Sequence, residues 1–592
     1  MSRPSPHLLL RAPTPSQMSL SFCEANPREL KRWIAALPKA NIGETARQLY
    51  QGMAELNQLI TASDNRLQLL ELLRPEVYYV CKHLERHFLN QAIVLDERAR
   101  KVANLCQALQ NQLAIGYKQI VVDIVPKLGK DRLQTLAISI QRALHCLNGP
   151  LVRASLLYCP VPEGLWLELH QLYQIAREHK VHSIVVADDL ALAVRSLSPE
   201  QTYACALLMG SSRCNQMRQS AISKLAEALE GWSAWVKIQP ASEASSLFAI
   251  APGVDGPPRY KTLFTDEQVV NLPGLDPQPL AEAIKVYLEL PAEQRGQSRL
   301  PLPNGISSDL LQLVAAAWGD VAERTFQRTP GQGTLTLCVG MSSLHYHLGG
   351  ERSFSDILRR PAGRAAEFGS VSTPDVWAGT FDADKMGSGY EEIQYNQPGA
   401  PGDSLNNAST AEDHPTFVLQ IVNHSPGGYC LAWLKDVPPQ LQAGEMVGIQ
   451  DAPSQGWSVA VVRWVRQVRT GGTQMGIELV APNAQPCGLQ LVRTNEPNSQ
   501  YLRGLLLPEI RAIDIPATLL APRLPFQEGN KVMINTNGDE SRAGIGKRVA
   551  STGSFNQFEY RALEAPVEPG KAPGSAGDAP PEDDFDSLWK DL

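Results

Sequence analysis

The turn at residues 423–428 gathers groups that could hold a nucleotide. It reads Asn-His-Ser-Pro-Gly-Gly between two apolar runs. The Asn423 amide and the Ser425 hydroxyl can both donate and accept hydrogen bonds, while Gly427 and Gly428 let the backbone approach a ligand closely. The same residue types also build ordinary hairpin turns, so the turn alone leaves a purely structural role open.

Pairs of arginines four residues apart could supply the cations of such a site. The chain contains Arg28/Arg32, Arg295/Arg299, Arg324/Arg328 and Arg360/Arg364. A guanidinium fork can pair with guanine O6 and N7, and its plane can stack on a base. Arg28 and Arg32 share one face of a predicted helix, where we expect them to be solvated.

Short apolar runs around the turn predict a small antiparallel β-barrel. The runs cover 417–422, 429–434, 444–449, 457–464 and 475–479, and Gly, Pro and Asp separate them. Short strands at this spacing are typical of a closed or nearly closed barrel. In the fourth run Arg463, Arg466 and Arg469 surround Trp464, where they could stack on a ligand, contact a phosphate or remain solvated edge-strand charges.

At these residues the chain resembles the PilZ family of bacterial cyclic di-GMP receptors. Asn423, Ser425 and Gly428 fill the family's [Asp/Asn]-x-Ser-x-x-Gly turn. The family places its Arg-x-x-x-Arg pair ahead of the barrel, so Arg324 and Arg328 are the preferred pair, although the family's pair normally lies nearer to the turn. The resemblance implies that cyclic di-GMP binds as a ligand to Arg324, Arg328, Asn423, Ser425, Gly427 and Gly428. The second-choice pair is Arg360 and Arg364.

The composition indicates an ordinary protein of several domains. The chain has 592 residues, a net charge of −7 and 43% hydrophobic residues, which disfavours a generic nucleic-acid-binding surface. Its ten cysteines include no Cys-x-x-Cys motif, so we expect reduced thiols and a cytoplasmic location. No apolar run is long enough for a membrane helix or a signal peptide, and membrane insertion is not expected.

The patterns along the chain predict an α+β protein, with an all-α N-terminal region followed by the barrel. Asn26 with Glu29, and Asn41 with Glu44, mark two helix starts. The expected order is a flexible N-terminus (1–25), an all-α helical domain (26–233), a mixed connector (234–320), a PilZ-like barrel (321–495) containing a long disordered insertion (349–414), a β-rich extension (496–562) and a disordered acidic tail (563–592). The extension could continue the same sheet or form a second β unit.

We find no sequence pattern typical of an enzyme. P-loop, nucleophile-elbow and His-Glu-x-x-His motifs are missing from the sequence. His345 and His347 are expected on one face of a strand and could hold a metal in a hydrolase, but no acidic or cysteine partner stands at a recognisable spacing.

The leading hypothesis is therefore a non-enzymatic cyclic di-GMP receptor. The nucleotide site would be coupled to a protein partner through the helical region or through the acidic C-terminal tail, which ends in the aromatic segment 585–592. By resemblance the output would be motility, biofilm formation or secretion. The alternative is a degenerate PilZ-like scaffold that binds protein partners and no nucleotide.

Overall fold

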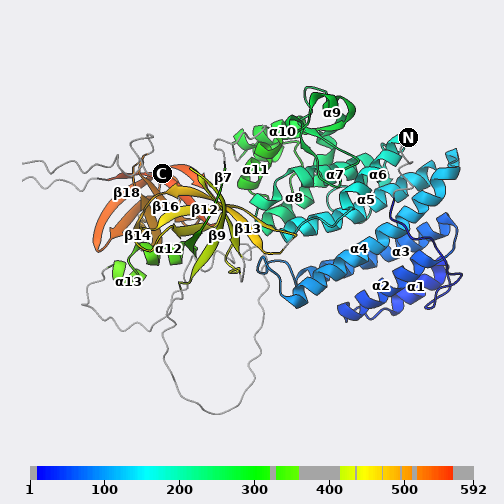
Figure 1. Cartoon of the computed structure of the whole chain (residues 1–592), viewed down its shortest axis with the longest axis horizontal. Coiled ribbons are helices and arrows are strands. Elements are labelled where there is room, and N and C mark those ends of the chain that lie inside the picture. The colour runs from blue at the N-terminus through cyan, green and yellow to red at the C-terminus, as the bar shows by residue number, and fades with distance from the viewer. Residues whose placement is uncertain are drawn as a thin grey trace, which may run out of the picture.

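The protein has helices at one end and two β-barrels at the other (Figure 1). The computed structural model describes residues 10–291, 293–319, 328–358, 414–433, 437–469, 471–493, 497–509 and 516–563. The predicted α+β class, with a helical N-terminal region followed by antiparallel barrel strands, is confirmed. The acidic tail from residue 564 onward lies outside the described residues.

The N-terminal region packs long helices against one another. Its helices are α1 (Pro27–Ala36), α2 (Ile42–Gln58), α3 (Ser63–Glu85), α4 (Glu97–Ile124), α5 (Leu133–Leu156), α6 (Leu165–Glu178), α7 (Pro199–Ser211) and α8 (Gln219–Trp232). The predicted caps are confirmed, because Asn26 Oδ1 accepts from Glu29 N at 3.0 Å and Asn41 Oδ1 accepts from Glu44 N at 3.1 Å. The region also holds a two-stranded sheet, β1 (Val186–Ala187) with β2 (Ser196–Leu197), so it is not purely helical.

Residues 10–25 are held against the helices, although their composition predicts a flexible segment. Leu10 is buried, and Gln17 forms a β-bridge with Leu59. The backbone N–H of Ser21 donates to Glu55 Oε2 at 2.8 Å. Backbone pairing and one buried leucine therefore order a stretch in which local propensity favours no regular structure. The first nine residues lie outside the described part of the chain.

A mixed unit follows the helices. A four-stranded sheet in the order β3-β6-β4-β5 packs beside three helices. The elements are β3 (Lys237–Pro240), β4 (Phe248–Ala249), β5 (Arg259–Tyr260), α9 (Asp266–Asn271), β6 (Pro273–Asp276), α10 (Gln278–Glu289) and α11 (Ser308–Gly319). Tyr260 donates its hydroxyl to the carbonyl of Ala317, which ties the sheet to α11.

The first barrel runs from β7 to β13. Its strands are β7 (Thr329–Pro330), β8 (Thr334–Val339), β9 (Thr416–Ser425), β10 (Gly428–Trp433), β11 (Met446–Gln450), β12 (Ser458–Gln467) and β13 (Thr473–Ala481). The order is β10-β13-β12-β11-β8-β9-β7, and pairing of β10 with β9 closes the sheet on itself. The long strand β9 pairs with β10 along one edge and with both β7 and β8 along the other.

The second barrel is a separate closed ring of six strands. It contains β14 (Gln485–Leu491), β15 (Leu502–Leu507), β16 (Thr518–Pro522), β17 (Lys531–Thr536), β18 (Asp539–Ser551) and β19 (Phe555–Ala562). β14 lies within the range 321–495 that the sequence assigns to the first barrel, but it pairs with β15 and β17. Of the two possibilities for the later strands, the structure has the second β unit.

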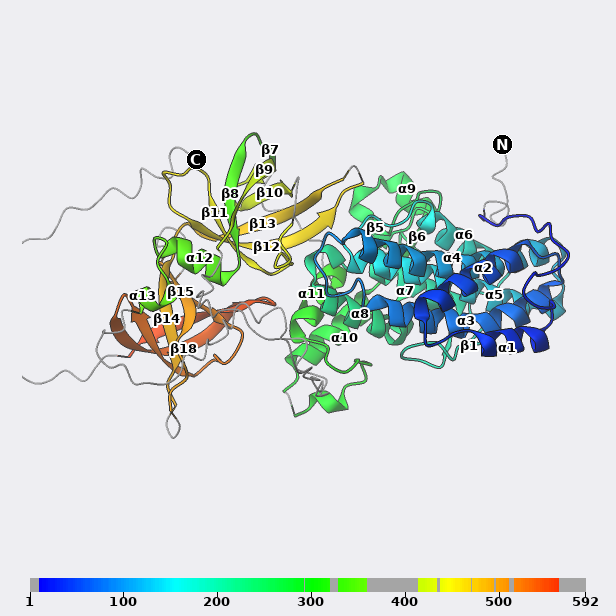
Figure 2. The same cartoon turned by 90° about the horizontal axis from the view of Figure 1, so that it is seen from below.

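Helix α12 (Met341–Leu348) lies between the two barrels (Figure 2), where it contacts β8 and β11 on one side and β14 and β15 on the other. Leu344 of α12 belongs to a buried cluster that also contains Met446 of the first barrel and Leu505 of the second. The strand-like interpretation of this stretch is wrong, since Gly340, at φ 88°, ends β8 and the chain then turns into a helix.

Only the first part of the predicted disordered insertion 349–414 can be compared with the structure. Residues 349–358 are folded, contrary to expectation, and include α13 (Phe354–Ile357), which packs on β14. Ile357 is fully buried, which explains the order of this short segment. Residues 359–413 lie outside the described part of the chain.

One arginine connects the helices to both barrels. Arg218, which precedes α8, donates to the carbonyl of Ala443 and to Glu445 Oε2, both at 3.2 Å, and also to the hydroxyl of Ser554. Ala443 and Glu445 belong to the first barrel, whereas Ser554 lies in the turn between β18 and β19. Helices and barrels therefore meet at a shared polar junction.

Two further observations bear on the class of protein. All ten cysteines are free, as the sequence predicts, and seven of them are buried. Among the described helices, none combines the length and apolarity that crossing a bilayer requires.

Candidate ligand-binding site

The turn that the sequence singles out is a tight hairpin between β9 and β10. Pro426 and Gly427 form the two-residue loop, and Ser425 pairs with Gly428 across it. Gly428 has φ 151°, and a Cβ atom there would lie 2.0 Å from the carbonyl oxygen of Ile477 on β13. Gly427 accepts a hydrogen bond from Leu479 N at 3.0 Å. In the structure the second glycine is thus needed for close strand packing, whatever approaches the turn from outside.

A β-bulge in β9 decides which way the polar residues of the turn face. Leu431 pairs with Ile421, but its neighbour Cys430 pairs with Asn423, so Val422 is an extra residue. Directly paired residues share one face of a sheet and consecutive residues lie on opposite faces. Since Leu431 is in the barrel core, Asn423 must lie on the outer face with Cys430.

The outer face carries the turn's hydrogen-bonding groups in accessible positions. Asn423 and Ser425 are both partly exposed, and they are two positions apart on β9, so they share this face. The Ser425 hydroxyl lies 3.5 Å from the carbonyl of Gly428, at the limit of a hydrogen bond. Its hydroxyl therefore remains available to a ligand.

Strand β7 brings one of the predicted arginines to the turn. Thr329 pairs with His424 and Pro330 with Asn423, and Arg328 immediately precedes this pairing and is exposed. Burial raises the pKa of the Cys430 thiol, and the positive charges of Arg466 and Arg328 oppose that rise. Arg328 thus lies within electrostatic range of the same outer face.

The other three predicted arginines, Arg324, Arg360 and Arg364, lie outside the described residues. Their placement relative to the turn is therefore not tested, and their assignment stays a prediction. Of the residues predicted to bind a ligand, the structure brings together Arg328, Asn423, Ser425 and the two glycines that shape the turn.

Trp464 and Arg466 of β12 lie on the same outer face, two strands away from β10. Trp464 pairs with Gly476 of β13, and Gly476 pairs with Cys430 of β10, so the three positions form one row across the strands. The indole lies on Gly476, because a Cβ atom there would be 2.0 Å from Trp464 Nε1. Arg466 lies over the indole with its Cζ 5.3 Å from the ring centroid, and its Nη2 donates to Gln474 Oε1 at 2.7 Å.

The neighbouring arginines have other contacts. Arg463 pairs with Glu478 at 2.6 Å, and both side chains are exposed. Arg469 donates to the carbonyl of Val161 in the helical region at 3.0 Å. Arg466 therefore lies over the indole in the row of Asn423, whereas Arg463 is paired with Glu478 beside Gly428 and Arg469 contacts the helical region. The i, i+2 spacing of Trp464 and Arg466 puts them on one side of a strand, but only the strand order shows which other residues share it.

Asn423, Cys430, Gly476 and Trp464 form one row on the outer face, which we call the trough. Its two middle residues are small: Cys430 is buried, and the Trp464 indole lies against Gly476. Neighbouring strands lie about 4.8 Å apart, so the three intervals from β9 to β12 span about 14 Å. A planar, anionic molecule fits this arrangement, since amide, hydroxyl and indole groups face it and guanidinium groups lie near both ends.

The histidines considered as metal ligands are arranged differently from the expectation. His345 and His347 both lie on α12 and not on a strand. His345 is buried with its Nε2 3.1 Å from the carbonyl of Cys487, and His347 Nε2 is 3.2 Å from the carbonyl of His414. Within the described ranges, no group of three or more His, Cys, Asp or Glu could hold a metal ion.

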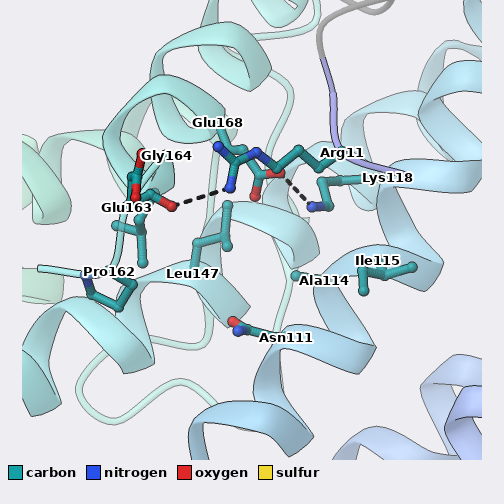
Figure 3. A pocket seen from close by; sticks show the side chains of 11 residues that line it. Arg11, Asn111, Ala114, Ile115, Lys118, Leu147, Pro162, Glu163, Gly164 and Glu168 are labelled. Carbon is teal, nitrogen blue, oxygen red and sulfur yellow. Dashed lines mark hydrogen bonds and ion pairs between the residues drawn. The ribbon is translucent and has the colours of Figure 1, made fainter. Parts of the chain in front are cut away.

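A cavity of about 170 Å³ lies in the helical region (Figure 3). Lys118 Nζ donates to Glu168 Oε1 at 2.8 Å inside it, and Arg11 donates to the carbonyl of Glu163. Burial lowers the pKa of Lys118, and the charge of Arg11 lowers it further, while Glu168 opposes both effects. Because the buried lysine already has its carboxylate partner, we interpret this cluster as structural.

A larger cavity of about 380 Å³ lies where the barrel meets the helices. Its walls include Trp166 of α6, Met209 of α7 and Arg469 from the hairpin between β12 and β13. Arg469 is the residue through which the hairpin lines this cavity.

Comparison with known proteins places these parts in one family. Three family models match successive stretches: "Cyclic-di-GMP receptor FimW, N-terminal domain" matches residues 28–243, "Cyclic-di-GMP receptor FimW, middle PilZ domain" matches 247–486, and "FimW C-terminal beta-barrel domain" matches 487–563. A curated Pseudomonas aeruginosa protein described as "Cyclic-di-GMP receptor FimW" is 59% identical over 608 aligned residues, which cover 100% of both chains. No solved structure matches the chain.

Proposed function

This chain belongs to the FimW family of cyclic-di-GMP receptors, and we propose that it binds cyclic di-GMP on the outer face of its first barrel. One observation carries the proposal: Asn423 and Ser425 are accessible on the outer face, and β7, which begins directly after Arg328, pairs with Asn423 and His424. The nucleotide is a ligand in this proposal, and no step of catalysis is assigned to the chain.

The chemistry of cyclic di-GMP matches these groups. The ligand presents two guanine edges, two π faces and two phosphates. Arg328 can pair with a guanine edge or a phosphate, since a guanidinium presents a planar fork of donors. The Asn423 amide and Ser425 hydroxyl can donate to phosphate oxygens or accept from guanine N–H groups.

Calorimetry with cyclic di-GMP tests the site. We expect Arg328→Ala, Asn423→Ala and Ser425→Ala each to weaken binding, and loss of a bidentate arginine contact corresponds to about 5- to 150-fold. Arg32→Ala is the control, because its exposed pair with Glu29 lies on α1, away from the barrel. Arg324→Ala and Arg360→Ala would show which predicted arginine pair the ligand uses.

Two results would contradict the proposal in different ways. Wild-type protein that binds no cyclic di-GMP would favour a scaffold with a degenerate barrel. Wild-type binding that all three substitutions leave unchanged would place the ligand elsewhere on the chain.

We further propose that the nucleotide acts on the helical region through the hairpin of β12 and β13. Gln467 Nε2 donates to the carbonyls of Ile93 at 2.8 Å and Leu157 at 3.1 Å, while its backbone N–H donates to Tyr158 O. Gln467, which makes these contacts, is the residue directly after Arg466. A ligand that contacts Trp464 or Arg466 could therefore shift β12, and with it Gln467, relative to the helices. Such a shift requires that the ligand binds the shifted and the unshifted position of β12 with different affinity.

A protein partner would then sense the change at the helical region. The acidic tail with its aromatic end, residues 585–592, is the second predicted contact for a partner, and it lies outside the described residues. Both partner surfaces remain predictions.

A further inference from the structure

We infer that Trp464 stacks on a guanine of the bound nucleotide, and that Arg466 both holds the indole and supplies a second cation to the site. This inference rests on the proposed function and deepens it. It adds residues on β12 to a site that the sequence motif confines to the turn and a preceding arginine pair.

The first argument is the position of the indole. Trp464 is partly exposed on the outside of the barrel, in the same cross-strand row as Asn423. Stacking a purine on an aromatic ring is a common way to bind single nucleotides, because every base offers a π face. The row places this ring at the other end from the Asn423 amide.

The second argument is the support beneath and beside the ring. Gly476 leaves the space in which the indole lies, since any side chain there would overlap Nε1. Arg466 Cζ lies 5.3 Å from the ring centroid, and the arginine is itself held by Gln474. An aromatic ring held in place by its neighbours loses little conformational freedom when a base stacks on it.

The third argument is the distribution of charge. The charges of Arg466 and Arg328 both reach the Cys430 thiol, which lies between their strands. Cyclic di-GMP carries two phosphates, and cations approaching from opposite sides of the trough would neutralise both. Arg463 and Arg469, in contrast, are engaged by Glu478 and by the helical region.

Fluorescence and calorimetry with cyclic di-GMP test this inference. Trp464→Ala is expected to weaken binding about 5- to 150-fold, the range that loss of one base–aromatic stack produces. Trp464→Phe keeps a ring, so it should bind within about threefold of wild type but lose the ligand-induced quenching of tryptophan emission. Trp457→Phe is the control, because Trp457 stacks on His347 away from the trough and should leave affinity and quenching unchanged.

A second variant keeps the inference testable if Trp464→Ala does not fold. Gly476→Ala retains the indole but displaces it, and it should weaken binding in the same direction. Thermal unfolding of each variant would show that the barrel is intact. Arg466→Ala should also weaken binding, while Arg32→Ala, which breaks an exposed pair on α1, should not.

The outcomes separate the inference from the proposed function. Absence of binding to wild type would overturn the proposed function and the inference with it. Weak binding by Asn423→Ala, together with wild-type affinity and quenching in Trp464→Ala, would overturn the inference alone. Reduced affinity in Trp464→Ala, with quenching lost in Trp464→Phe and kept in Trp457→Phe, would support it.

Discussion

At residue 428 the absence of a side chain decides how closely β10 can approach β13. The sequence motif associates this glycine with a ligand, and the structure adds a packing role, since a Cβ atom would lie 2.0 Å from Ile477 O. The same residue also has a backbone conformation, φ 151°, that side chains disfavour.

We therefore expect Gly428→Ala to lower the stability of the barrel as well as its ligand affinity. Strained backbone of this kind costs about 1–3 kcal/mol, and the overlap with Ile477 adds to that cost. Thermal unfolding would measure the loss. Gly456→Ala is the control, because nothing lies within 4 Å of a Cβ atom there. Equal melting temperatures for the two variants would contradict the packing role.

The residue types of the site could be predicted from the sequence. Whether their side chains face into or out of the barrel could not. Asn423 and Ser425 stand out in the sequence because they fill a turn motif at the end of an alternating run. Strict alternation along β9 would place Asn423 on the same face as Ile421, inside the barrel. The bulge at Val422 reverses this, and it arises from pairing with β10, which a single strand does not reveal.

At the level of elements, the hairpin of β12 and β13 contacts the helical region and also carries part of the candidate site. Its strand β12 presents Trp464 and Arg466 to the trough, and its tip presents Gln467 and Arg469 to the helices. One rigid element therefore connects the candidate site with the region predicted to bind a partner.

The double variant Gln467→Ala, Arg469→Ala should uncouple the helical region from the candidate site. Hydrogen exchange measured with and without cyclic di-GMP should show a ligand-induced change at residues 157–161 in wild type and a smaller change in the variant, because the connecting hydrogen bonds are lost. Ligand affinity should stay within about threefold of wild type, since neither side chain faces the trough. A full-sized response in the variant would exclude the hairpin as the connection.

Elements defined by local signals were predictable, and those defined by distant contacts were not. The caps of α1 and α2 depend on residues three positions apart in the sequence, and both form as expected. The stretch 341–348 shows apolar residues that suit a strand, yet it is helical because it fills the space between two barrels. The neighbour that decides its conformation is more than a hundred residues away in sequence.

For the whole molecule, Arg218 is the residue at which helices and both barrels meet. Glu445 is buried, and burial raises its pKa while Arg218 and Ser554 oppose the rise. Without Arg218 the carboxylate would remain buried without its cation, and breaking a buried pair in this way costs about 3–5 kcal/mol.

Arg218→Ala is therefore expected to destabilise the protein, and more strongly at pH 8 than at pH 5.5. The reason is that a carboxyl whose pKa is raised in the folded state binds a proton more readily there than in the unfolded state, so folding is favoured as pH falls through that window. Thermal unfolding at both pH values would measure the difference. Arg32→Ala, which breaks only an exposed pair with Glu29, should have little effect. Matching losses for the two variants would show that the junction contributes no stability.

The sequence by itself determined the class of the fold, the helix caps, the barrel strands beside the turn, the free cysteines and the polar turn that led to the PilZ resemblance. These depend on residues close together in the chain, where periodicity, capping and turn chemistry act. Only the tertiary structure decided that Asn423 faces outward, that β7 pairs with β9 directly after Arg328, and that Trp464 lies in the same cross-strand row. Strand order and register bring these residues together, and both result from pairing between segments far apart in the chain.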